Sequence, residues 1–100
     1  MDFFTPYMDR ITALCKAHKV ASLYAFGSTV KGNMDAQSDV DLLLDLPLED
    51  PYEFVEHYEA LEDGFMHLFN RPVDLVSKRT IRNPYRLQLI EQHQLKLYGA

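Results

Sequence analysis

The chain is poor in cysteine and in long apolar runs, and each shortage excludes a class of protein. Cys15 is the only cysteine of the 100 residues, so no disulfide can form within the chain. No apolar run approaches the roughly 20 residues that a membrane-spanning helix needs. The sequence does not open with a basic segment followed by an apolar run, so we expect no signal peptide. These absences predict a cytoplasmic protein without a membrane anchor.

Basic residues are also scarce. Lys and Arg number 10 against 15 Asp and Glu, which gives a formal net charge of -5. A protein that binds DNA or RNA directly usually presents a basic surface, so this function is disfavoured. A nucleotide ligand is still compatible with the charge, because a metal ion can neutralise its phosphates. The length and the hydrophobic fraction of 47% predict a single globular domain over residues 1–100.

Apolar periodicity predicts an α/β (α+β) fold, with a small mixed sheet of three to four strands flanked by helices. Asp50 is expected to cap a helix, with Pro51 in its first turn. A short helical turn is expected at 28–32, closed by Gly32, before a polar loop at 33–38. The other elements are expected as helices over 2–18, 50–69 and 83–93, core strands over 20–26, 39–46 and 73–76, and an edge strand over 95–98.

The segment Ser38-Asp39-Val40-Asp41 places two carboxylates at the start of an otherwise apolar strand. Because strand side chains alternate faces, Asp39 and Asp41 are expected side by side, about 6–7 Å apart. Such carboxylates repel each other unless a cation lies between them, and magnesium is a natural occupant. The same face receives Leu43 and Asp45, the latter as a solvated strand end, whereas the buried face is formed by Val40, Leu42, Leu44 and Leu46.

Two further segments point to phosphoryl chemistry. Asp74 interrupts the apolar strand Val73-Asp74-Leu75-Val76, and pairing of this strand with the 39–46 strand would complete a cluster of three carboxylates. Such clusters hold two metal ions about 3.5–4 Å apart for in-line phosphoryl transfer. Gly27-Ser28 is expected to let the backbone approach a ligand and to aim free N–H groups at a phosphate, with one more hydrogen bond from the Ser28 hydroxyl.

Gly27-Ser28, then Ser38-Asp39-Val40-Asp41-Leu42, then Asp74 on a later strand resemble the polymerase-beta-type nucleotidyltransferases. The length and the ending, Asn83-Pro84-Tyr85-Arg86 and then Tyr98-Gly99, resemble their minimal nucleotidyltransferase (MNT) branch. The resemblance implies the nucleotidyltransferase fold, two Mg²⁺ ions and ATP as the donor. It also implies that Asp39, Asp41 and Asp74 bind the metals and that Asp74 favours deprotonation of the acceptor. The nucleotide-binding residues that it implies are Gly27, Ser28, Lys31 and Ser38.

The same resemblance implies a partner. MNT proteins commonly pair with a small all-helical HEPN protein, and there the MNT member is an antitoxin that transfers AMP from ATP to a tyrosine of the toxin. A homo- or hetero-oligomer is therefore expected. The larger relatives carry a helical domain that this chain has no room for, so the site is expected to be an open groove on the odd-numbered face of the 39–46 strand.

One departure from the family keeps alternatives open. Many MNT proteins carry arginines where this chain has Thr29 and Lys31. Thr29 therefore lacks the positive charge, and Lys31 keeps the charge but lacks the guanidinium group that can donate two parallel hydrogen bonds. A non-catalytic binding module that neutralises its partner by contact is the alternative function. Transfer to a small molecule such as an antibiotic is a third, disfavoured by the missing acceptor domain.

Other polar residues have simpler interpretations beside a role in the site. Lys78, Arg79 and Arg82 follow the Asp74 strand, and they either reach a triphosphate or form a solvated basic loop. The histidines lack the spacing of metal ligands, so ordinary helix-surface or core positions are expected for His18, His57, His67 and His93.

Overall fold

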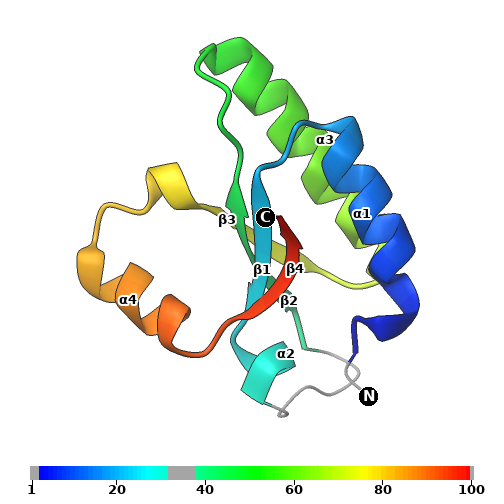
Figure 1. Ribbon diagram of the computed structural model, residues 1–100, viewed down its shortest axis with the longest axis vertical. Coiled ribbons are helices and arrows are strands. Elements are labelled where there is room, and N and C mark those ends of the chain that lie inside the picture. The colour runs from blue at the N-terminus through cyan, green and yellow to red at the C-terminus, as the bar shows by residue number, and fades with distance from the viewer. Residues whose placement is uncertain (1–2, 32–37, 100) are drawn as a thin grey trace.

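The computed structural model describes residues 3–31 and 38–99, with Lys31 described by its backbone alone. Its centre is a four-stranded mixed sheet with the strand order β3-β2-β1-β4, shown in Figure 1. β1 is antiparallel to both of its neighbours, and β2 is parallel to β3. The predicted fold class is confirmed, including the edge strand. The strands are β1 (Ser22–Phe26), β2 (Val40–Asp45), β3 (Val73–Ser77) and β4 (Leu95–Gly99).

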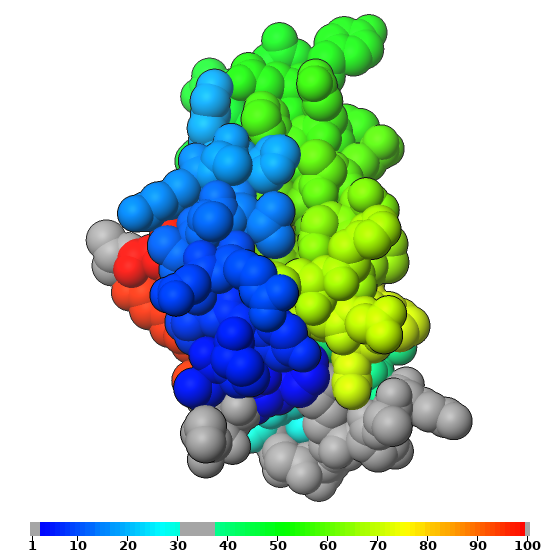
Figure 2. Space-filling model, turned by 90° about the vertical axis from the view of Figure 1, so that its right-hand side faces the viewer, coloured from blue at the N-terminus to red at the C-terminus, as the bar shows by residue number. Residues whose placement is uncertain are grey.

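Two helices cover one face of the sheet, and one covers the other. α1 (Met8–Ala17) and α3 (Pro51–Phe69) lie side by side, as Figure 2 shows from their outer surface. α4 (Pro84–Gln92) lies on the opposite face, and the four-residue α2 (Ser28–Lys31) follows β1 (Figure 1). Short 3-10 turns, η1 (Thr5–Tyr7) and η2 (Lys78–Thr80), precede α1 and α4. None of the helices in the described part of the chain is long and apolar enough to cross a membrane.

Local sequence explains the ends of α1 and the start of α3. The Asp50 carboxylate accepts hydrogen bonds from the N–H groups of Tyr52 and Glu53, and Pro51 occupies the first turn of α3, as predicted. The first helix is shorter than the predicted 2–18, because its start is a 3-10 turn and Lys19 adopts a positive φ of 64° just beyond its end. The predicted closure by Gly32 and the loop up to residue 37 lie outside the described residues.

The main core lies between the sheet and the pair α1 and α3. The even-numbered side chains of β2 point into it, as predicted. Gly64 of α3 faces α1, where a Cβ atom would lie 3.0 Å from Leu14 Cδ2, so this glycine lets the two helices pack closely. The largest fully buried side chains are Phe4, Phe65, Ile11, Leu23, Leu42, Leu44, Leu46 and Leu61.

The odd-numbered face of β2 is only partly open, which corrects the expected open groove. Leu43 is 2% exposed and packs with Val76 of β3 and Ile90 of α4 in a second, smaller core. Asp39 stays exposed and Asp41 is half-buried. α4 therefore closes the face beyond Asp41 and leaves the carboxylates at its uncovered end.

The second core predicts that Leu43→Ala destabilises the protein by about 2–5 kcal/mol, the usual cost of a cavity at a buried leucine. Equilibrium unfolding in urea measures this loss, and Leu42→Ala in the main core is the matched control. A loss below about 0.5 kcal/mol, typical of surface positions, would mean that α4 does not cover this face.

Candidate active site

Sheet register brings two of the predicted carboxylates together. In the parallel pair β2–β3, Asp41 lies directly opposite Asp74, and in the antiparallel pair β1–β2 it lies opposite Phe26. Directly paired residues point to the same face of a sheet. Phe26, Asp41 and Asp74 therefore form a row across three strands, and Asp39 stands exposed just before β2. The predicted pairing of the two aspartate-bearing strands is confirmed.

Gly27 packs against the carboxylate of Asp41. Gly27 has a φ of 70°, and a Cβ atom at this position would collide with Asp41 Oδ2. The backbone N–H of Ser28 donates a hydrogen bond to the same carboxylate. The Gly27-Ser28 turn therefore holds the carboxylate in place. The Ser28 N–H, one group of the expected phosphate cradle, is thus bonded within the protein, and phosphate binding by Gly27 and Ser28 stays a prediction.

The charges of Asp74 and Asp39 act on the carboxyl group of Asp41. Burial, then Asp74, then Asp39 raise the pKa of Asp41 above its ordinary value, and the Ser28 N–H opposes the rise. A cation among these groups would relieve the repulsion, and carboxylate oxygens are the ligands that magnesium prefers. The donor set therefore suits magnesium. Across residues 3–31 and 38–99, however, no three Asp, Glu, His or Cys side chains are arranged to hold a metal ion. Metal binding by Asp39, Asp41 and Asp74 stays a prediction.

A hydrogen bond from α3 steadies the strand that carries Asp74. The Tyr58 hydroxyl donates to the backbone carbonyl of Leu75, the residue that follows Asp74. Burial is the largest cause of the raised pKa of Tyr58, followed by the charges of Glu62 and Asp74. The hydroxyl therefore stays protonated and remains a donor, which ties α3 to the strand beside the site.

The remaining predicted nucleotide-binding residues have different surroundings. The backbone carbonyl of Ser38 accepts a hydrogen bond of 3.3 Å from Arg71 Nη1, which fixes the chain just before Asp39. Lys31 belongs to α2, and its side chain lies outside the description. Thr29 is 9% exposed, and its hydroxyl donates to the Phe26 carbonyl at 2.9 Å. Thr29 thus holds α2 onto the end of β1.

The basic loop after β3 lies at the wrong end of the sheet to reach these carboxylates. It follows Ser77, which pairs with Leu44 three positions beyond Asp41. Arg79 donates to the backbone carbonyl of Leu48 and stacks over Phe54, 4.7 Å from the ring centroid. The structure favours an anchoring role for Arg79 over contact with a triphosphate.

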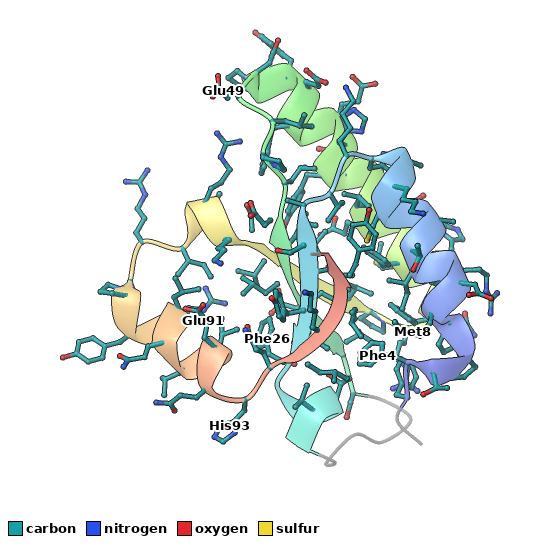
Figure 3. The ribbon with its side chains drawn as sticks, in the orientation of Figure 1. Phe4, Met8, Phe26, Glu49, Glu91 and His93 are labelled. Carbon is teal, nitrogen blue, oxygen red and sulfur yellow. The ribbon has the colours of Figure 1, made fainter. Side chains whose placement is uncertain are left out.

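A cleft beside Gly27 brings residues of α4 next to this turn, a neighbourhood that the sequence did not predict. Its volume is about 190 Å³, and it lies between α4 and the end of β1. In Figure 3, Phe26 lies between the sheet and α4, and His93 lies where α4 turns towards β4. No motif spacing relates a late helix to the Gly27 turn, so only the tertiary structure reveals this neighbour. The lining residues are Phe26, Gly27, Arg86, Leu89, Ile90 and His93.

Comparison with known proteins identifies sequence relatives over most of the chain. The nucleotidyltransferase domain family matches residues 9–97. A candidate protein adenylyltransferase of Methanocaldococcus jannaschii is 32% identical over 75 residues, which cover 75% of this chain and 74% of the relative. The span matched by the family, residues 9–97, contains the Gly27 turn and all three aspartates.

Several solved structures with the same fold come from toxin–antitoxin systems. A chain in the crystal structure of a toxin–antitoxin with AMP-PNP has a TM-score of 0.75 and 22% identity, covering 94% of this chain and 74% of that chain. A chain in the complex of tri-AMPylated Shewanella oneidensis HEPN toxin with MNT antitoxin has a TM-score of 0.61 and 21% identity, covering 93% and 70%. At these identities the likeness shows the fold alone.

The crowded carboxylates predict that Asp41→Asn stabilises the metal-free protein at neutral pH. The fold raises the pKa of Asp41 above 3.8, so the ionised carboxylate is less favourable in the folded than in the unfolded chain. The gain in unfolding free energy is present above the folded pKa, shrinks as the pH falls through it and vanishes below 3.8.

Urea denaturation in the presence of a chelator, at neutral pH and below the ordinary pKa of aspartate, measures this difference. Asp45→Asn, at the far end of the same strand, is the matched control. A variant at position 41 that is less stable than the parent at neutral pH would show that the carboxylate stabilises the fold.

Proposed function

This chain belongs to the nucleotidyltransferase domain family, and from that premise we propose that it transfers AMP from ATP to a hydroxyl group. The observation that carries the proposal is the row of Asp41 and Asp74 on paired strands, with Gly27 packed against Asp41. The row sits at the uncovered end of its face, where Asp39 and Asp74 are exposed. Two substrates can therefore approach these carboxylates from solvent.

The proposed reaction is an in-line displacement at the α-phosphorus. The acceptor oxygen forms a bond to this phosphorus while the bond to the oxygen bridging the α- and β-phosphorus atoms breaks. Pyrophosphate leaves with the electron pair, and Asp74 receives the acceptor proton. Magnesium held by Asp39, Asp41 and Asp74 would neutralise the charge that develops on the phosphate oxygens. The Gly27-Ser28 turn contributes by fixing the orientation of the Asp41 carboxylate.

For the acceptor, we propose a tyrosine of a helical HEPN-type toxin, with this chain as its antitoxin. The solved complex of tri-AMPylated HEPN toxin with MNT antitoxin supports this choice through its shared fold. A tyrosine hydroxyl on a partner can extend to Asp74, because this residue is exposed on an edge strand. A docked partner would also exclude water, which otherwise competes as the acceptor.

The alternative, a non-catalytic binding module, rested on the missing arginine at position 29. The structure gives Thr29 a role of its own, because its buried hydroxyl holds the Phe26 carbonyl. This hydrogen bond explains the presence of threonine at position 29, so the missing arginine does not imply that the activity has been lost. The binding module remains an outcome that the experiment below can identify.

We expect AMP on a tyrosine of a HEPN-type partner protein when both proteins are incubated with ATP and magnesium. Mass spectrometry of the partner measures the transfer. Asp39→Asn and Asp41→Asn should lower the rate about a thousandfold or more, since each removes a ligand of the catalytic metals. Asp45→Asn, on the same strand but away from the site, should transfer at the parental rate.

Two outcomes would contradict this proposal in different ways. Parental rates in both Asp39→Asn and Asp41→Asn would exclude the two-metal mechanism. A partner that stays unmodified, yet is bound and inhibited by Asp41→Asn as well as by the parent, would identify the protein as a binding module.

A further inference from the structure

The cleft between α4 and the end of β1 adjoins the carboxylates without containing them. Its apolar wall is formed by Phe26, Leu89 and Ile90, and Gly27 links it to Asp41. Arg86 and His93 are the charged and titratable side chains among its described lining residues. A volume of about 190 Å³ is below the roughly 300 Å³ at which pockets for whole small molecules begin. The cleft therefore suits one part of a larger ligand.

Strand order places this cleft on a defined side of Asp41. β2 lies between β3, which carries Asp74, and β1, which ends at Phe26 and Gly27. The cleft and Asp74 are therefore on opposite sides of Asp41. In an in-line displacement the attacking and the leaving oxygens lie on opposite sides of the phosphorus. If the acceptor approaches at Asp74, the leaving group must extend towards the cleft.

Arg86 is available for an anion at this place. It is exposed and makes no hydrogen bond or ion pair with any residue that the structure describes. Its charge is not among the causes that shift the pKa of Asp41, so the guanidinium is not paired with that carboxylate. Thr29 carries no charge, and Arg79 is held against Phe54 at the other end of the sheet.

We propose that Arg86 binds the β- and γ-phosphates of the nucleoside triphosphate donor and holds pyrophosphate as it leaves. A guanidinium matches this task because it can donate two parallel hydrogen bonds to phosphate oxygens. The assignment rests on the proposed function, which supplies the triphosphate and the direction of attack. It explains how a chain with Thr29 in place of an arginine binds its donor, since α4 supplies the arginine from the opposite wall of the cleft.

Binding of three probes in magnesium buffer tests this assignment: inorganic pyrophosphate, a non-hydrolysable ATP analogue and AMP. By calorimetry, Arg86→Ala should weaken pyrophosphate and the ATP analogue about tenfold to a hundredfold, the usual effect of losing a charge-assisted contact. AMP should bind as it does to the parent. Arg86→Lys should have an intermediate affinity for both ligands, since lysine keeps the positive charge but cannot donate two parallel hydrogen bonds from a planar group. Arg82→Ala is the matched control, because it removes an equal charge from just before α4, outside the cleft.

Three outcomes would overturn the assignment: no pyrophosphate binding by the parent, parental affinity in Arg86→Ala, or an equal loss in Arg86→Ala and Arg82→Ala. AMP transfer to the partner, measured in parallel, tests the proposed function separately. If the parent protein transfers AMP but Arg86→Ala binds pyrophosphate as tightly as the parent, only the Arg86 assignment is wrong. Pyrophosphate binding that depends on Arg86, without transfer, keeps the anion site and removes the enzymatic proposal.

Discussion

The packing of Gly27 against the Asp41 carboxylate is the contact on which the rest of the site depends. The β1–β2 register brings the end of β1 beside Asp41, and only a residue without a Cβ atom fits there. The positive φ of Gly27 then turns the chain so that the Ser28 N–H meets the carboxylate. This one arrangement sets the orientation of Asp41, the start of α2 and the position of the neighbouring cleft.

The carboxylates are tolerated because the elements that carry them are held by packing elsewhere. The ionised Asp41 is disfavoured by burial and by two neighbouring charges. The same strand is buried on its other face through Leu42 and Leu44 and beneath α4 through Leu43. A strand clamped on both faces can present an unfavourable charge at its exposed end, where a cation and a nucleotide would make that charge favourable.

Sequence reasoning predicted the strand pairing that places Asp41 beside Asp74 better than it predicted the surroundings of these residues. Asp39, Asp41 and Asp74 stand out because carboxylates interrupt apolar strands, and Gly27 because it ends one. Strand alternation could not show that Leu43 is buried, since that depends on which helix folds back over the sheet. The position of Arg86 beside Gly27 could not be predicted for the same reason, and the inward hydrogen bond of Thr29 has no signature in the sequence. The role of Lys31 stays a prediction.

The central claim is that Asp39, Asp41 and Asp74 form one electrostatic unit completed by a cation. Carbon-13 NMR titration of the Asp41 carboxyl tests it most directly, in the metal-free parent, in Asp74→Asn and with added magnesium. The account predicts that the titration midpoint of Asp41 lies above 3.8 in the metal-free parent. Relative to that value, the midpoint should be lower in Asp74→Asn and lower in the parent with magnesium. A midpoint at or below 3.8 that responds to neither change would contradict it.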